Sequence, residues 1–274
     1  MIKHYLKVAF RNLMKYKTQS LVSIIGLAVG FTCFALSALW IRYEMTYDNF
    51  HKGSDRIYMV RAHYANEPGT SKFTPYPLME YLQDKMPEIE AATAFTPHHV
   101  KFRLEETEQE VGMIDADSVF MNFFDIQLLK GTVNFLKSDG QEVAITKEFA
   151  KRLFSKEEDA LGKEVEVGRR VCKIGAIVSG WSNHSNIPYN ILAPARHSPR
   201  WGSSNEQLFI RVRERTDIDA FRTKMSTVRI NDIEKESELS DLLITRMSAL
   251  RYSDYVDKAD VVISFSYIFY LFIS

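Results

Sequence analysis

The chain has 274 residues and no formal net charge, because 35 lysines and arginines balance 35 aspartates and glutamates. Five of the basic residues and none of the acidic ones lie within residues 1–17, which leaves 30 basic against 35 acidic residues in the rest of the chain. An acidic remainder has no basic face to release counterions from phosphates, so nucleic acid is excluded as a partner.

An uncharged segment runs from Thr18 to Ile41. Its residues would form about 36 Å of helix, enough to cross a hydrocarbon core of about 30 Å. We therefore predict a transmembrane helix over residues 18–41. The alternative is a cleaved signal peptide, but the apolar region of such a peptide spans only about 7–15 residues.

The segment before it, residues 1–17, carries basic residues at every fourth position: Lys3, Lys7, Arg11 and Lys15. This spacing predicts a basic amphipathic helix that lies on the lipid bilayer at the cytoplasmic face. A simple cytosolic extension of the spanning helix is the alternative. Because basic residues stay on the cytoplasmic side, we expect a cytoplasmic N-terminus at the plasma (inner) membrane and an extracytoplasmic main domain.

Small residues recur on one face of the predicted transmembrane helix, where Gly26 and Gly30 form a GxxxG pattern. Such faces let helix backbones approach closely in lipid. We predict a helix-packing role for Gly26 and Gly30, against the alternative that glycine is simply common in membrane helices.

Residues 261–274 are also uncharged, but a transmembrane helix needs about 20 residues. We expect this segment to be the start of a second, truncated transmembrane helix, which would make the chain a fragment of a longer protein. The alternative is a segment that packs against a partner.

Residues 42–260 show alternating strand and helix patterns that predict an α+β domain. Two αβ halves, at about 55–104 and 205–250, are expected to flank a β-rich insertion at about 105–200, and residues 55–104 have the order of a βαβ unit. The predicted helices are 75–90, 147–154 and 217–233. The predicted strands are 55–64, 91–104, 110–115, 125–129, 142–146, 163–167, 171–178, 190–193, 208–213 and 242–247.

Smaller features of this domain also give predictions. Thr146 and Asp217 are expected to cap the helices that follow them. Cys172 alternates with apolar residues, which is typical of a buried structural thiol. The other cysteine, Cys33, lies in the apolar segment, so the two cannot form a disulfide with each other.

No motif of a known catalytic or nucleotide-binding site occurs in the chain. Gly162-Lys163 is followed by Glu164, so there is no Walker A loop, and no GxGxxG, HExxH, CxxC or GxSxG is present. We expect a protein that is not an enzyme, with no catalytic, cofactor-binding or metal-binding residue. The histidines at 98, 99, 184 and 197 are expected to be solvated, because zinc needs three or four converging ligands. An exported hydrolase built on His184 and nearby serines remains the weakest alternative.

Several segments, in chain order, resemble those of MacB/FtsX-type ABC transporter permeases. They are Arg11-Asn12-Leu13, Ile25 through Gly30, Tyr47 through His51, Asp55 through Tyr58, Phe123 through Asp125, Leu128 through Gly131, Leu161 through Lys163, and Gly175 through Leu192. The resemblance covers nearly the whole chain. It departs at Ala160 and Ser182, which stand where prolines are usual.

This resemblance implies that residues 42–260 form a MacB-like periplasmic core domain with a porter-like part and a β-rich insertion. It implies a permease subunit that dimerises with a second copy and engages a separate or fused ABC ATPase. The subunit would relay ATP-driven motion to the extracytoplasmic domain for export or extraction of a substrate. The alternatives are a singly anchored binding or adaptor module and a non-functional truncated permease.

Overall fold

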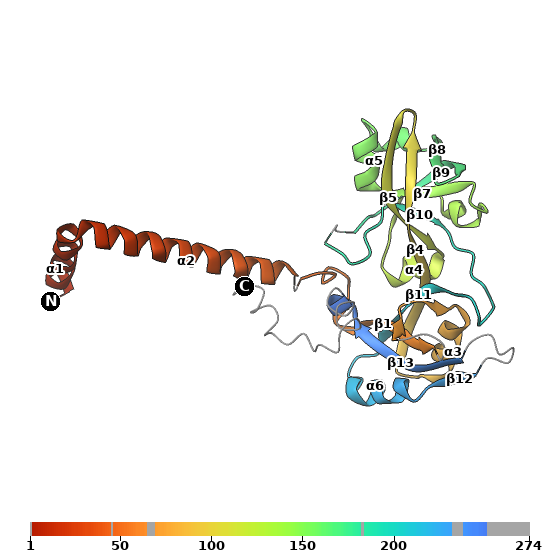
Figure 1. The fold of residues 1–274 in the computed structure, drawn as a ribbon. Helices are drawn as coiled ribbons and strands as arrows, with labels where there is room; N and C mark the ends of the chain where they lie inside the picture. Colours follow the sequence, from red (N-terminus) through yellow and green to blue (C-terminus); the bar gives the residue numbers. More distant parts are fainter. Residues whose placement is uncertain (1, 45, 65–68, 182–183, 232–237, 251–274) are drawn as a thin grey trace. The chain divides into compact units, whose positions relative to one another are not determined.

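A computed structural model describes residues 2–44, 46–64, 69–181, 184–231 and 238–250 (Figure 1). The chain forms two compact units, Met1–Thr46 and Tyr47–Ser274. The predicted second membrane segment, residues 261–274, lies outside the described residues.

The first unit consists of helices α1 (Ile2–Lys15) and α2 (Lys17–Glu44). Within the described residues, α2 is the one helix that is long and apolar enough to cross a membrane, and none of its most apolar window is buried. It extends beyond the predicted span of 18–41 at both ends, because lysine, arginine and glutamate continue a helix readily.

The second unit contains a four-stranded antiparallel sheet made of β1 (Ile57–Tyr64), β4 (Ile89–Leu104), β11 (Ser204–Val212) and β13 (Glu238–Arg246). The strand order is β13-β1-β11-β4. Helix α3 (Pro77–Lys85) connects β1 to β4, and α6 (Ile218–Ser226) lies between β11 and β13 in the chain. Each βαβ unit therefore holds a strand of the other between its own two strands, which is the split βαβ, ferredoxin-like arrangement.

Strand β4 continues from this sheet into a second one (Figure 1). Its later half, residues 96–104, pairs with β5 (Thr107–Ala116), and the pairing continues through β10 (Ile191–Pro194), β7 (Glu142–Thr146), β9 (Arg170–Val178) and β8 (Glu164–Val167). Strand β8 pairs back with β4 through Phe102↔Val167 and Arg103↔Glu166. These strands thus form a closed ring, and we call this part the β-ring lobe and the first sheet with its helices the porter lobe.

Shorter elements complete the fold. They are β2 (Thr70–Ser71), β3 (Thr74–Pro75), β6 (Leu128–Gly131), β12 (Arg229–Asn231), α4 (Ser118–Phe123), α5 (Lys147–Leu153), and 3₁₀ turns at Ser54–Arg56, Val133–Lys137, Glu157–Ala160 and Met247–Ala249. Strand β12 extends the porter sheet beside β13, and β6 pairs with β9.

Three clusters of buried side chains make up the core. Strand β1 alternates between two of them: Tyr58 and Val60 pack with α3 and α6, whereas Ile57 and Met59 face a second cluster that includes α4. The third cluster receives side chains from every strand of the β-ring lobe and includes Phe149 of α5. The porter sheet is therefore covered on both faces.

Most predicted strands occur, but several predicted bounds are wrong. Helix 75–90 ends at Lys85, because Met86 precedes Pro87 and the residue before a proline avoids the helical region. Helix 217–233 ends at Ser226, and Arg229–Asn231 forms strand β12 in a stretch rich in β-branched residues. The first βαβ unit is not contiguous, since β11 separates β1 from β4.

Both predicted caps are confirmed. The Thr146 side chain accepts a hydrogen bond from the backbone N–H of Phe149, and Asp217 accepts from those of Asp219 and Ala220. Helix α4 was not predicted, because its six residues are too few to show a helical period. It is capped by Asp117, which accepts from Phe120 N at 2.8 Å.

Candidate functional site

Residues 47–51 follow α2 in the chain and are attached to the loop at residues 184–187. The Asp48 side chain is fully buried and accepts hydrogen bonds from Ser185 Oγ at 2.5 Å, Asn186 N at 3.1 Å and Asn186 Nδ2 at 2.6 Å. The backbone N–H of Asp48 donates to the carbonyl of His184 at 3.2 Å. We call this set of residues the Asp48 anchor. Its hydrogen bonds satisfy a carboxylate that has no access to water.

The backbone of Asp48 explains part of the residue choice. Its φ is 57°, in the left-handed region that aspartate and asparagine tolerate better than most residues. Burial raises the pKa of the Asp48 carboxyl, and the hydrogen bonds from Ser185 and Asn186 offset part of that effect.

Aromatic contacts hold the same segment. The Tyr47 ring centroid lies 3.9 Å from that of His184. The His51 ring lies 4.8 Å from Trp181 and 5.1 Å from Phe124. Burial lowers the pKa of His51 to about 4, and the charge of a nearby arginine adds to the effect, so His51 packs as a neutral ring. Segment 47–51 is thus fixed by hydrogen bonds and by ring packing.

The Ser185 hydroxyl has a structural role in this anchor. It donates to Asp48, and its oxygen accepts from the backbone N–H of Ile187 at 3.1 Å. The residue is also buried. A hydroxyl used in this way holds the loop together and gives no support to the hydrolase alternative.

A second polar cluster joins the two lobes at His197, which follows β10. Its Nδ1 lies 3.0 Å from Glu206 Oε2 on β11, and its Nε2 lies 3.3 Å from Asp117 Oδ2 at the start of α4. The ring stacks on Tyr76 with centroids 4.0 Å apart. Burial by itself lowers the pKa of His197, but hydrogen bonds to Asp117 and Glu206 outweigh it and raise the pKa to about 9. A cationic His197 therefore bridges two carboxylates.

The histidines differ from the sequence-based expectation. His197 is 17% exposed and His184 packs on Tyr47, so the prediction that they are solvated is wrong for both. His98 on β4 pairs with Asp115 of β5, with 2.8 Å between Nε2 and Oδ2. Among the described residues, no three His, Cys, Asp or Glu side chains gather as a metal site.

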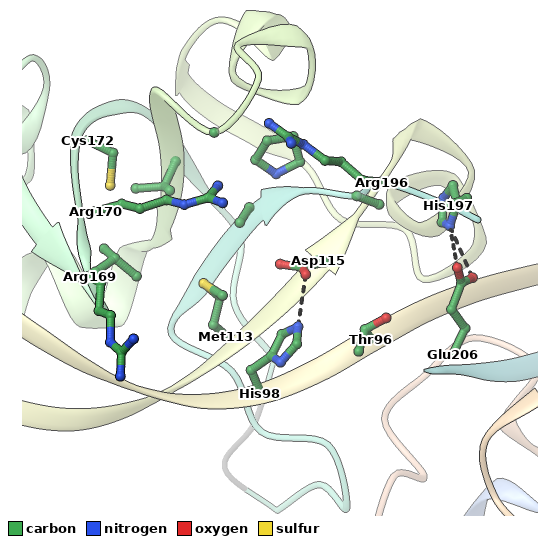
Figure 2. A pocket seen from close by; sticks show the side chains of 16 residues that line it. Thr96, His98, Met113, Asp115, Arg169, Arg170, Cys172, Arg196, His197 and Glu206 are labelled. Atoms are coloured by element: carbon green, nitrogen blue, oxygen red, sulfur yellow. Dashed lines mark hydrogen bonds and ion pairs between the residues drawn. The ribbon is translucent and has the colours of Figure 1, made fainter. Parts of the chain in front are cut away.

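A cleft of about 360 Å³ lies beside these histidines and is lined by residues of both lobes (Figure 2). His98 and Asp115 lie in its middle, with Arg169 and Arg170 at one side and Arg196 and His197 at the other. Its apolar lining is Met113, Val143, Val167, Cys172, Ala193, Pro194 and Ala195. As predicted, Cys172 is buried, and burial raises the pKa of its thiol to about 11, so the thiol stays protonated.

Gly26 and Gly30 lie on α2. A side chain added at either position would meet no atom within 4 Å in the described part of the chain. Their role in helix packing stays a prediction.

The sequence places Asp48 and the 184–187 loop inside two segments that resemble the permease family, Tyr47 through His51 and Gly175 through Leu192. The resemblance of these two segments to the permease family is the only sequence feature that points to the anchor. It does not indicate that the two segments are in contact. The sequence patterns do not single out Arg169 or Arg170, and they predict a solvated His197 instead of a bridging one.

The family model of the MacB-like periplasmic core domain matches residues 20–228, well over half of the chain. The chain belongs to this family. The fold agrees, because a domain of a Porphyromonas gingivalis protein described as a permease superposes with a TM-score of 0.56 at 20% identity, over 72% of this chain and 91% of that one. The periplasmic region of MacB from Actinobacillus actinomycetemcomitans gives 0.50 at 12% identity, over 74% and 94%. No curated protein matches the sequence.

The family assignment confirms the resemblance seen in the sequence and the α+β fold with an N-terminal apolar helix. The MacB-like periplasmic core domain is a part of ABC transporter permeases, which are transport proteins and not classical enzymes. Together with helix α2, it indicates a membrane-anchored protein with an extracytoplasmic domain.

Proposed function

We propose that this chain is the N-terminal part of an ABC transporter permease subunit. It relays ATP-driven motion from the cytoplasmic side to the MacB-like core domain, which acts in the export or extraction of a substrate. The observation that carries this proposal is the Asp48 anchor, which ties the segment directly after α2 to a loop of the core domain.

The anchor suits a relay because it lies only a few positions after the membrane helix in the chain. Helix α2 ends at Glu44, and Asp48 lies four positions later in the chain. Because residues 47–51 are fixed to the core domain, the connection between the end of α2 and that domain is short. A displacement of the end of α2 then pulls on the core domain itself.

The proposed partners follow from the same assignment. The chain has no P-loop within its 274 residues, so a separate or fused ABC ATPase supplies the energy. A second permease copy forms the dimer, and the basic helix α1 lies on the cytoplasmic face of the bilayer.

Purification of the intact membrane protein that contains this chain tests the proposal. An affinity tag is used to recover the protein from mildly solubilised membranes, and the recovered proteins are identified by mass spectrometry. We expect an ABC ATPase in near-stoichiometric amount, either as a separate subunit or in the same polypeptide. Recovery of the protein without any ABC ATPase would contradict the proposal.

Orientation is tested in intact cells. Glu106 is exposed at the β4–β5 turn, and the native cysteines are removed as Cys33→Ser and Cys172→Ser. A membrane-impermeant maleimide should label Glu106→Cys without lysis. A matched Asn12→Cys variant in α1, which is also exposed, should be labelled only after lysis. The reverse pattern would refute the proposed topology.

A further inference from the structure

We propose that the groove between helices α1 and α2 binds an anionic phospholipid of the cytoplasmic leaflet, with the headgroup at the bend between the helices and an acyl chain along α2. This inference rests on the proposed placement of α1 at the cytoplasmic face of the bilayer. It goes beyond a general contact with the membrane, because it names the class of lipid and the place where it binds.

The groove lies where the chain bends between the two helices. Helix α1 ends at Lys15 and α2 begins at Lys17, with a turn between them. The groove holds about 510 Å³, which is the size of a site for one small ligand. Its lining includes Asn12, Tyr16, Ser20, Ile24 and Leu27. This spacing of three or four positions puts the lining on one side of the helix pair.

Polar side chains of the groove have no protein partner among the described residues. Gln19, Ser20 and Ser23 all line the groove, and their side chains make no hydrogen bond within the described part of the chain. Farther along the same helix, the hydroxyl groups of Thr32 and Ser37 each donate to a backbone carbonyl at 2.8 Å. Polar groups of a membrane helix need such partners, because hydrocarbon offers none. The free groups beside the bend are therefore placed to bond the phosphate and ester oxygens of a lipid.

The charge around the bend selects an anionic headgroup. Lys15 and Lys17 flank Tyr16, and the Lys15 ammonium lies 5.4 Å from the centre of the Tyr16 ring. Neither lysine has an ion pair among the residues that the structure describes, and the first acidic residue of the chain is Glu44. Lysines close to a bilayer surface are attracted by anionic headgroups. A zwitterionic headgroup offers no net charge to the two lysines.

The rest of the groove suits an acyl chain. Leu13 of α1 and Ile24 and Leu27 of α2 give it an apolar lining, and all three side chains are exposed. Hydrocarbon removes such surface from water. The order of a polar, basic end and an apolar end is that of headgroup and chain in a phospholipid. An apolar partner helix would cover the polar end as well and would leave its groups without acceptors.

Photo-crosslinking in lipid vesicles tests this site. The intact membrane protein that contains this chain is reconstituted in equal amounts of phosphatidylglycerol and phosphatidylcholine, with photoreactive benzoylphenylalanine in place of Tyr16. A matched variant carries the same group in place of Thr18, which is exposed and lies outside the lining. Mass spectrometry identifies the adducts. We expect at least a fivefold preference for phosphatidylglycerol at position 16 and less than a twofold preference at position 18.

The other outcomes are distinguishable. Equal labelling by the two lipids at position 16 would overturn the anionic site, and adducts with a protein segment there would assign the groove to a partner helix. Either result would leave the expected ATPase and the proposed relay untouched. Absence of lipid adducts at both positions would contradict the proposed bilayer placement of α1 as well.

Two double variants test the role of charge. Lys15→Gln/Lys17→Gln should lower the preference at position 16 below twofold, while the three remaining basic residues of the segment 1–17 maintain the orientation. The matched control, Lys156→Gln/Lys163→Gln, removes the same charge from exposed positions of the core domain and should keep the fivefold preference. Equal preference in the two double variants would show that the lysines at the bend do not recognise the lipid.

Discussion

The carboxylate of Asp48 accepts a hydrogen bond of 2.6 Å from the side-chain amide of Asn186, which lies 138 positions later in the chain. This contact joins the first residues after the membrane helix to the loop that precedes β10. Because the two residues lie far apart in the chain, the contact closes a loop that contains most of the core domain. The segment that leaves the membrane is therefore built into the domain and is not a free linker.

Replacing Asp48 with asparagine should destabilise the core domain. The amide replaces one of the two acceptor oxygens with a donor group, so either the Ser185 hydroxyl, which donates to Oδ1, or the two N–H groups of Asn186, which donate to Oδ2, lose their acceptor. Buried donors left without an acceptor cost about 1–3 kcal/mol. Chemical denaturation of the full chain measures this loss. The exposed Asp55→Asn serves as the control, and equal stability of the two variants would show that the anchor contributes nothing.

Stability should fall with rising pH because of His197. The pKa of His197 is about 9 in the folded protein against an ordinary 6.5, so protonation stabilises the fold fully below pH 6.5 and this contribution is lost as the pH rises through 9. The difference between the two values corresponds to about 3 kcal/mol. Unfolding measured from pH 6 to pH 9.5 should show this loss.

Two substitutions check the origin of that pH dependence. His197→Gln should be less stable at pH 6 and should lack the decline between pH 6.5 and 9, because Glu206 and Asp117 lose their cationic partner. The exposed His99→Gln should keep it. A decline that persists in His197→Gln would assign it to another group.

Gly112 of β5 should not tolerate a side chain. A Cβ there would lie 2.5 Å from the carbonyl oxygen of Pro188, a backbone atom that cannot turn away. We expect Gly112→Ala to cost about 1–3 kcal/mol, as overpacked cores do. Gly175→Ala is the matched control, because the shortest contact of its new Cβ, 2.6 Å, is with the movable Oε2 of Glu142, and the Glu142 Cβ lies 3.2 Å away. Thermal unfolding should rank Gly112→Ala as the less stable variant, and the opposite order would be inconsistent with this packing.

The small face of α2 should carry contacts within the membrane. Leucine at Gly26 and Gly30 would separate two helix backbones that approach closely there. We expect Gly26→Leu/Gly30→Leu to reduce association of the intact protein with its membrane partner, measured by energy transfer between labelled copies in vesicles. Ala28→Leu/Ala35→Leu lies off this face and should associate as the parent chain does. Loss of association in both variants would indicate a general effect of bulk.

The parts of the fold that can be predicted from the sequence are those determined by residues that are neighbours in the chain. Strand 142–146 was predicted with the bounds that the structure has, and its Thr146 cap follows from a residue type preferred at helix starts. The position of β11 between β1 and β4, and the closure of the ring by β8, depend on contacts between distant segments. Local patterns do not carry that information.

The same reasoning applies to the candidate sites. Asp48 and Ser185 lie 137 positions apart, and each alone looks like an ordinary loop residue. His197 looked solvated because its neighbours in sequence are polar, whereas its carboxylate partners come from α4 and β11. Family resemblance marked the two segments of the anchor, but only the structure brings them into contact.

Hydrogen–deuterium exchange is the most direct test of the proposed relay. Exchange is measured on the intact permease with its ATPase, with and without vanadate-trapped nucleotide. The account predicts that trapping changes exchange in residues 47–51 and 184–187 together, and that Asp48→Ala uncouples the change at 184–187 from that at 47–51. Exchange in both segments that is unaffected by trapping, in a complex that hydrolyses ATP, would contradict the relay.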